Sequence, residues 1–312
     1  MGNTYNSLGQ YQQAIEFLQQ SLEIYREIGD SPEERLRQRN GEGKSLSNLG
    51  NTYNYLGQYQ QAIEFHQQSL EISREIGDSP EERLRQRNGE GKSLGNLGNA
   101  YNFLGQYQQA IEFHQQSLEI SREIGDSPEE RLRQRNGEGN SLGNLGNAYD
   151  SLGQHQRAIE FLQQSLEISR EIGDRNGEGI SLIGLGNAYN LLGQYQRAIE
   201  FYQQSLEISR EIGDRNGEGH SLSNLGNAYY QCGRTQEGFA ASYQAQKIFQ
   251  ELELPLEAMP YPHWLKSLIK LAQRGHLQLI LCFIFGLIAF PFALIWLILP
   301  LLWPLIRAQF RR

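Results

Sequence analysis

The fold is decided by the stretch from Gly179 to Arg210, GISLIGLGNAYNLLGQYQRAIEFYQQSLEISR, which EIGDRNGEG follows. Related copies fill most of the 312 residues, and each carries the signature Gly-Asn-Thr/Ala-Tyr. Successive signatures lie 48 residues apart in the first part of the chain and 40 apart later. Such a period is typical of a stacked array of helical units. The signatures start at Gly2, Gly50, Gly98, Gly146, Gly186 and Gly226.

Each copy contains two amphipathic patterns separated by a glycine. In the second copy, Leu46, Leu49 and Tyr53 share one face of a predicted helix. Gly57 ends this helix, because glycine readily adopts the left-handed conformation found at helix C-termini. A wider apolar stripe over residues 59–76 predicts a second, longer helix. One such hairpin cannot bury its own stripe, so we expect the units to stack.

This unit resembles the tetratricopeptide repeat. Leu49-Gly50, Tyr53, Ala62 and Phe65 stand where that motif has its Leu-Gly, Tyr, Ala and aromatic residues. The 40-residue period and the Leu-Gly-Asn triplets are similar to the long-repeat subclass of the Leu-Gly-Asn proteins, kinesin light chains and bacterial arrays. The resemblance implies an all-α superhelical solenoid of about six helix-turn-helix repeats over residues 1–253, with protein binding as its mode of action.

The two ends of the array differ from its middle. The first copy starts at Gly2 and lacks the upstream half of its first helix, so we expect it to be truncated and uncapped. The last copy has Cys232 in place of Leu and Gly238 in place of Ala, which is typical of a capping repeat.

Three copies are lengthened by the insert SPEERLRQ, at residues 31–38, 79–86 and 127–134. Ser31, Pro32 and Glu34 read as an N-cap, a first helical residue and the glutamate of a capping box. We therefore expect the insert to extend the next first helix. Eight residues are not a whole number of turns, so it should project as a ridge and not prolong the core stripe. The alternative is a surface insertion without a role.

The resemblance implies that the first helices line a concave groove. Asparagines form a stripe beside the core residues of these helices, and an amide can both donate to and accept from a peptide backbone. The alternative is that they are only solvated or bond locally. Lysines flank the stripe in two copies. Ser47, Gly95 and Gly143 stand where the chaperone-binding relatives have a clamp lysine, which argues against binding of a chaperone's acidic C-terminus. The predicted groove residues are Lys44, Asn48, Asn51, Asn54, Lys92, Asn96, Asn99, Asn102, Asn144, Asn147, Asn187, Asn190 and Asn227.

Composition favours binding over chemistry. Residues 1–254 carry a net charge of −13, and an acidic array is a poor nucleic-acid binder. Cys232 and Cys282 indicate neither a disulfide framework nor a metal site. His66 and His114 occupy equivalent positions that we expect at the edge of the core. We expect no cofactor and no enzymatic activity.

The tail differs in composition from the array. It is divided into a Pro-rich linker (254–262), an amphipathic interfacial helix (263–276), a transmembrane segment (277–306) and a basic tail (307–312). The segment 277–306 has no charged residue and is long enough to span the hydrocarbon layer. It predicts either a single tilted helix, which we prefer, or a hairpin broken at Pro291. The start of the chain predicts no secretory signal, so the array should stay in the cytoplasm, as in tail-anchored proteins.

Together these features predict a membrane-tethered scaffold or adaptor that binds a partner peptide in the Asn-lined groove. The alternative is a membrane scaffold that associates with itself through the uncapped first repeat.

Overall fold

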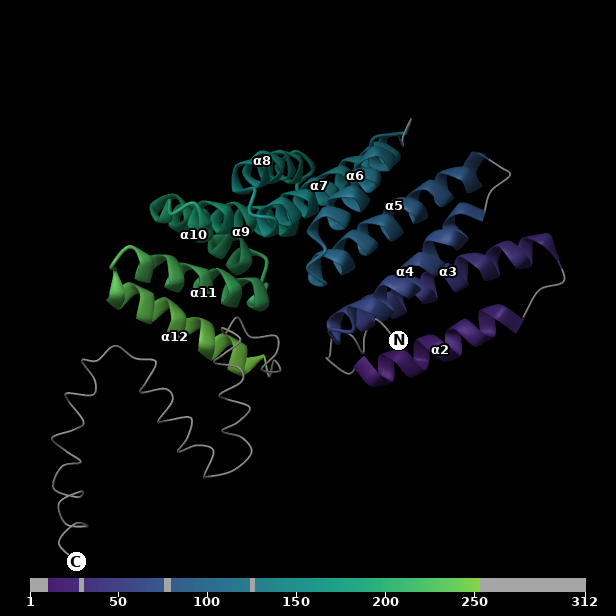
Figure 1. Cartoon of the computed structure of the whole chain (residues 1–312), viewed down its shortest axis with the longest axis horizontal. Helices are drawn as coiled ribbons and strands as arrows, with labels where there is room; N and C mark the ends of the chain where they lie inside the picture. The colour runs from purple at the N-terminus through teal and green to yellow at the C-terminus, as the bar shows by residue number, and fades with distance from the viewer. Residues whose placement is uncertain (1–10, 28–30, 76–79, 124–126, 253–312) are drawn as a thin grey trace, which may run out of the picture. The chain divides into compact units, whose positions relative to one another are not determined.

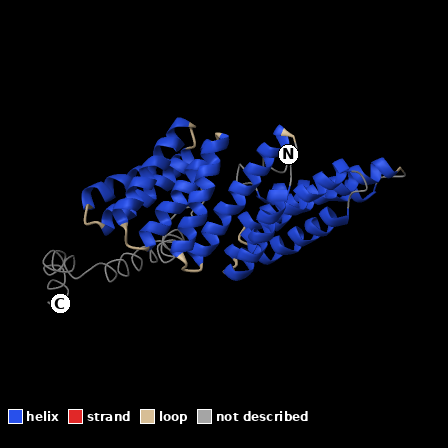
Figure 2. Ribbon diagram, turned by 90° about the horizontal axis from the view of Figure 1, so that it is seen from above, coloured by secondary structure: helices blue, strands red, loops and turns tan. Residues whose placement is uncertain are grey.

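A computed structural model describes residues 11–27, 31–75, 80–123 and 127–252. In these ranges the elements are all helices, which confirms the all-α prediction (Figure 2). Residues 1–252 form one compact unit. The predicted uncapped start and the whole predicted tail lie outside the described residues. The helices are α2 (Tyr11–Glu27), α3 (Pro32–Tyr55), α4 (Tyr59–Glu75), α5 (Pro80–Phe103), α6 (Tyr107–Glu123), α7 (Pro128–Ser151), α8 (His155–Ile172), α9 (Arg175–Leu191), α10 (Tyr195–Glu211), α11 (Arg215–Gln231) and α12 (Thr235–Glu251).

After α2, the helices form five hairpins that follow one another along the chain (Figure 1). A glycine turns each hairpin, as predicted. In the first complete pair Gly57 has a φ of +74°. The amide of Gln58 donates to the carbonyl oxygen of Tyr53 at 2.9 Å, and that of Gly57 donates to Asn54 at 3.0 Å. These two hydrogen bonds satisfy carbonyl groups in the last turn of α3. They also keep the connection to α4 short.

The sequence RNGEG lies inside helices and is not the junction that its glycines suggest. The helix α9 begins at Arg175, directly after Asp174, whose carboxylate accepts from the amide of Gly177 at 3.0 Å. In the longer copies the same sequence falls in the middle of α3, α5 and α7. These glycines serve close packing within the helices. A Cβ on Gly41, for example, would lie 2.2 Å from the Tyr25 ring.

The inserts extend the first helices, as predicted. The helices α3, α5 and α7 have 24 residues, whereas α9 and α11 have 17. Ser31 and Ser127 each form a complete capping box with the glutamate three residues later. The expectation that the insert stays off the core is wrong at Leu84, which packs against a core cluster that includes Ile63 and Leu94. The extension is therefore anchored on the second helix of the preceding unit.

Two buried histidines fill the space that helix glycines leave. The side chains of His66 and His114 are 0% and 1% exposed, so the expectation that they lie at the core edge is wrong. A Cβ on Gly50 or Gly98 would lie 2.5 Å from the ring of His66 or His114, respectively. Among the described residues, neither the two ring nitrogens of His66 nor Nδ1 of His114 has a hydrogen-bond partner. Burial therefore lowers the pKa of each histidine from 6.5 to about 4.

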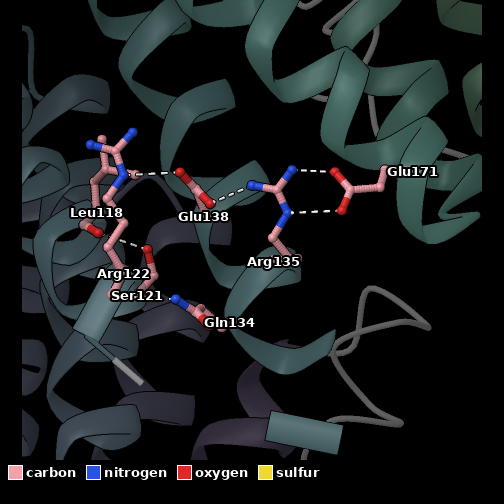
Figure 3. Close-up of polar contacts among 7 residues, drawn as sticks. All are labelled: Leu118, Ser121, Arg122, Gln134, Arg135, Glu138 and Glu171. Atoms are coloured by element: carbon pink, nitrogen blue, oxygen red, sulfur yellow. Dashed lines mark hydrogen bonds and ion pairs between the residues drawn. The ribbon is translucent and has the colours of Figure 1, made fainter. Parts of the chain in front are cut away.

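A chain of ion pairs repeats at the junctions between units. In Figure 3, Arg122 Nε and Arg135 Nη1 donate to the two carboxylate oxygens of Glu138, at 2.9 and 2.7 Å. Arg135 also pairs with Glu171 of the next second helix. At the equivalent Glu42, burial would raise the carboxyl pKa, but the hydrogen bonds from its two arginines outweigh burial and lower that pKa. The pairs fix each first helix between the second helices that flank it.

None of the described helices is long and apolar enough to cross a membrane.

Candidate binding groove

The first helices of the units pack against one another directly. Each of the helices α3, α5, α7 and α9 contacts the next first helix in the series, which ends at α11. Neighbouring second helices make no comparable contact among the described residues. Closer spacing on the side of the first helices places them on the inner face of a curved stack, where solenoids bind their ligands.

A groove of about 1320 Å³ crosses α3, α5 and α7 on this face. Asparagine is the commonest residue type in its lining. Most of the asparagines recur at equivalent positions of these helices, so the groove repeats similar amide groups from unit to unit. They are Asn40, Asn48, Asn51, Asn88, Asn96, Asn99, Asn136, Asn140 and Asn144.

The structure gathers about half of the predicted groove residues here. Lys44, Asn48, Asn51, Lys92, Asn96, Asn99 and Asn144 line this groove. Asn187 lines a second one, whereas Asn54, Asn102, Asn147, Asn190 and Asn227 line neither.

The excluded asparagines have identifiable surroundings. The Oδ1 atoms of Asn54, Asn102 and Asn190 are buried, and no described residue donates a hydrogen bond to them. Asn147 is the counterpart of Asn51, but α9 approaches it closely. A Cβ on Gly184 would lie 3.2 Å from its Oδ1. The stripe therefore faces the groove only over part of each first helix.

Some amides on the stripe are used inside the protein. The amide of Asn96 donates to Ser47 Oγ at 3.1 Å. Asn187 Oδ1 accepts from the Tyr202 hydroxyl at 2.8 Å. In contrast, no hydrogen bond to the side chains of Asn51 or Asn99 is found in the described part of the chain. The amides of Asn51 and Asn99 are therefore available to a ligand.

The floor of the groove was not predicted. Ile72, Ile120 and neighbouring serines of the second helices reach it between the first helices. They do so because Gly43 and Gly91 carry no side chain; a Cβ there would lie 3.2 or 3.1 Å from the isoleucine Cγ2. Ser69 Oγ donates to the carbonyl oxygen of Gly43 at 3.0 Å and fixes this approach. The sequence feature that could have predicted this floor is the pair of glycines in each NGEG.

Arginines of the inserts were also missed. Arg37, Arg85 and Arg133 line the groove. Arg37 precedes Lys44 by seven residues and Asn51 by fourteen, which places the three on one face of α3. This spacing is visible in the sequence, and it extends the predicted stripe into the insert.

The second groove, of about 560 Å³, crosses α9 and α11, which carry no insert. Ile180 occupies the position of Lys44 and Lys92, and its side chain is 55% exposed. Ile183 and Ile212 also line this groove. Arg175, its lining arginine, is engaged by Glu178 and Glu211. The two grooves thus present different chemistry.

The described residues contain no group of three His, Cys, Asp or Glu side chains placed to hold a metal ion.

A family model described as tetratricopeptide repeat matches residues 1–75, 41–123, 89–171 and 137–211. Among curated proteins no sequence match is found.

Solved structures share the fold. BtubC (BKLC) from P. vanneervenii has a TM-score of 0.61 at 18% identity, over 81% of this chain and 95% of that chain. Nearly identical repeats of a putative kinesin light chain from Podosopora anserina have a TM-score of 0.50 at 26% identity, over 67% and 95%. A Rap protein complexed with competence and sporulation factor has a TM-score of 0.59 at 12% identity, over 82% and 79%.

Proposed function

The chain belongs to the tetratricopeptide repeat family, and on that premise we propose that it is a scaffold that binds a protein partner through an extended segment. The segment lies in the groove across α3, α5 and α7. The observation that carries the proposal is that Asn51 and Asn99 line this groove and bond to no protein group among the described residues. An amide with a free donor and a free acceptor can pair with the backbone of an extended chain.

We further propose that the chain is of the long-repeat subclass of the family, and two features support this. Its unit period is 40 residues once the inserts are set aside. The repeats of the putative kinesin light chain are 26% identical to this chain over 67% of its length. We therefore assign the array to the kinesin-light-chain-like type. The same fold also occurs in the Rap protein, where it is complexed with a factor.

The second part of the proposal is that the scaffold is held at a membrane. Its support is the sequence 277–306, which has thirty residues and no charge, flanked by basic residues on both sides. A stretch of this length and polarity is typical of a spanning helix. In this arrangement the array stays in the cytoplasm and recruits its partner to the membrane surface.

The groove is tested by replacing Asn51 and Asn99 together by alanine. We expect partner binding to weaken about tenfold or more, because each lost amide leaves a partner backbone group unpaired at a cost of about 1 kcal/mol. A partner is first captured with the purified full chain in nonionic detergent. Its Kd is then measured against each variant by titration.

The matched control is the pair Asn54→Ala and Asn102→Ala, which makes the same chemical change on the same helices but outside the groove. We expect this control to bind the partner as the parent does. An unchanged Kd for the Asn51/Asn99 variant, at unchanged helix content, would sink the proposal.

A further inference from the structure

The inserts carry one side of the groove. Arg37 and Lys44 lie two turns apart on the same face of α3, about 10 Å along the helix axis. The same spacing joins Arg85 to Lys92 on α5, and Arg133 to Asn140 on α7. Across the three helices the arginines form one row and the lysines a shorter parallel row. A segment that crosses the helices between them meets a cation on either side.

The lining of this groove is basic although the array is acidic. Residues 1–254 carry a net charge of −13. Among the described residues that line the groove, six are basic and none is acidic. They are Arg37, Arg39, Lys44, Arg85, Lys92 and Arg133.

Five of these six cations form no ion pair with a described residue. Arg39 pairs with Glu42 and Glu75 and is therefore neutralised within the fold. The side chains of Arg37, Arg85 and Arg133, and of both lysines, are exposed to solvent in the groove. The three equivalent arginines Arg37, Arg85 and Arg133 have no ion-pair partner among the described residues. Their charges therefore add up to a positive potential on this face.

The acidic residues are placed elsewhere. Glu42, Glu90 and Glu138 are mostly buried at the junctions, where each accepts from two arginines. Glu64 and Glu71 are exposed on α4, a second helix. Glutamates also stand in the first turns of α3 and α7, at Glu33, Glu34, Glu129 and Glu130. None of these acidic residues lines the groove, so its lining is positively charged.

Resting on the proposed function, we propose that the inserts are part of the binding site and that the groove across α3, α5 and α7 selects an acidic, Asp/Glu-rich segment of the partner. The segment's carboxylates pair with the arginine and lysine rows, while the Asn51 and Asn99 amides bind its backbone. The groove across α9 and α11, with Ile180, Ile183 and Ile212, takes an apolar stretch in place of carboxylates.

A protein segment fits the groove better than a nucleic acid does. Tyr25 is the one aromatic residue among the described lining residues, whereas single-stranded nucleic acids need several stacking platforms. The isoleucine floor and the amide rows suit peptide side chains and backbone. An array with a net charge of −13 also repels a long polyphosphate chain.

The test measures fluorescence anisotropy with the full chain in nonionic detergent. The probe is a labelled peptide of about a dozen alternating Glu and Ser residues. A peptide with Gln in place of Glu is the neutral probe, and oligothymidylate of similar length is the nucleic-acid probe. The variant R37Q/R85Q/R133Q removes the arginine row, and R35Q/R83Q/R131Q makes the same change in net charge on the same helices, away from the lining.

We expect the acidic probe to bind more tightly than the neutral one, and more weakly as salt is raised. R37Q/R85Q/R133Q should weaken its binding about tenfold, whereas R35Q/R83Q/R131Q should change it less than about twofold. Equal losses in both variants, no preference for the acidic probe, or tighter binding of oligothymidylate would each overturn the inference. If the neutral probe binds equally well and remains sensitive to Asn51→Ala and Asn99→Ala, the inference fails while the proposed function stands.

Discussion

Lowering the pH from 7 to 5 is expected to reduce the free energy of unfolding by about 4 kcal/mol through two histidines alone. Burial holds the pKa of His66 and His114 at about 4, against 6.5 for an ordinary histidine. Between these values the unfolded chain binds protons that the folded chain does not, so stability falls as the pH falls. A pH of 5 lies about 1.5 units below the pKa of a histidine in the unfolded chain, so protonation stabilises the unfolded state by about 2 kcal/mol per histidine.

The measurement is urea unfolding of the full chain at pH 7 and pH 5, followed by circular dichroism. The matched variant is H66L/H114L, because leucine stands at the equivalent position 162 and is 1% exposed there. We expect the variant to lose about 4 kcal/mol less than the parent between the two pH values. Carboxyl titration is common to the parent and the variant, so the difference between them reports the histidines. Equal pH dependence of parent and variant would show that the rings are hydrated or hydrogen-bonded.

Introducing arginine at Leu287 is expected to release the protein from membranes. The full chain should sediment with membranes and resist alkaline carbonate, because the thirty uncharged residues of 277–306 bury far more apolar area than a surface helix does. A charge near the centre of a spanning helix costs about 2.5–3.5 kcal/mol of insertion. Leu287→Arg should therefore move protein into the soluble fraction.

The control is Gln309→Arg, which adds the same charge within the basic tail and should leave fractionation unchanged. If carbonate strips the parent chain from membranes, or if both variants fractionate alike, then 277–306 is not an anchor.

The repeat allowed the fold to be predicted from the sequence. It did not allow prediction of the positions where a side chain of one helix packs into the space beside a glycine of another. Leu49, Gly57 and the capping residue Ser31 each predict a local feature that the structure contains. Helix propensity does not place the glycines of NGEG inside a helix, because it penalises glycine and takes no account of the neighbour that needs its missing Cβ. Gly41 and Gly43 sit mid-helix only because Tyr25 and Ile72 occupy that space. Such a contact is a property of the stack and not of one hairpin.

About half of the groove residues could be predicted from the sequence, because the pattern of one hairpin does not show what its neighbours cover. Asn51 and Asn99 follow from the helical period alone. Asn147 shares that period, yet the approach of α9 at Gly184 removes it from the groove. His66 illustrates the opposite error, since polarity suggests an edge position whereas the space above Gly50 draws the ring fully inside. Sequence periodicity fixes the face of a residue but not the neighbour that covers it.

Lysine footprinting distinguishes a ligand held by the first helices from one held by the second helices. Residues 1–254 contain three lysines. Lys44 and Lys92 line the groove, whereas Lys247 on α12 is 70% exposed and lines neither groove. When the captured partner is bound to the full chain, an amine-reactive reagent should label Lys44 and Lys92 several-fold more slowly and Lys247 at its original rate. If Lys44 and Lys92 are labelled at an unchanged rate when the partner is saturating, the first helices do not hold the ligand.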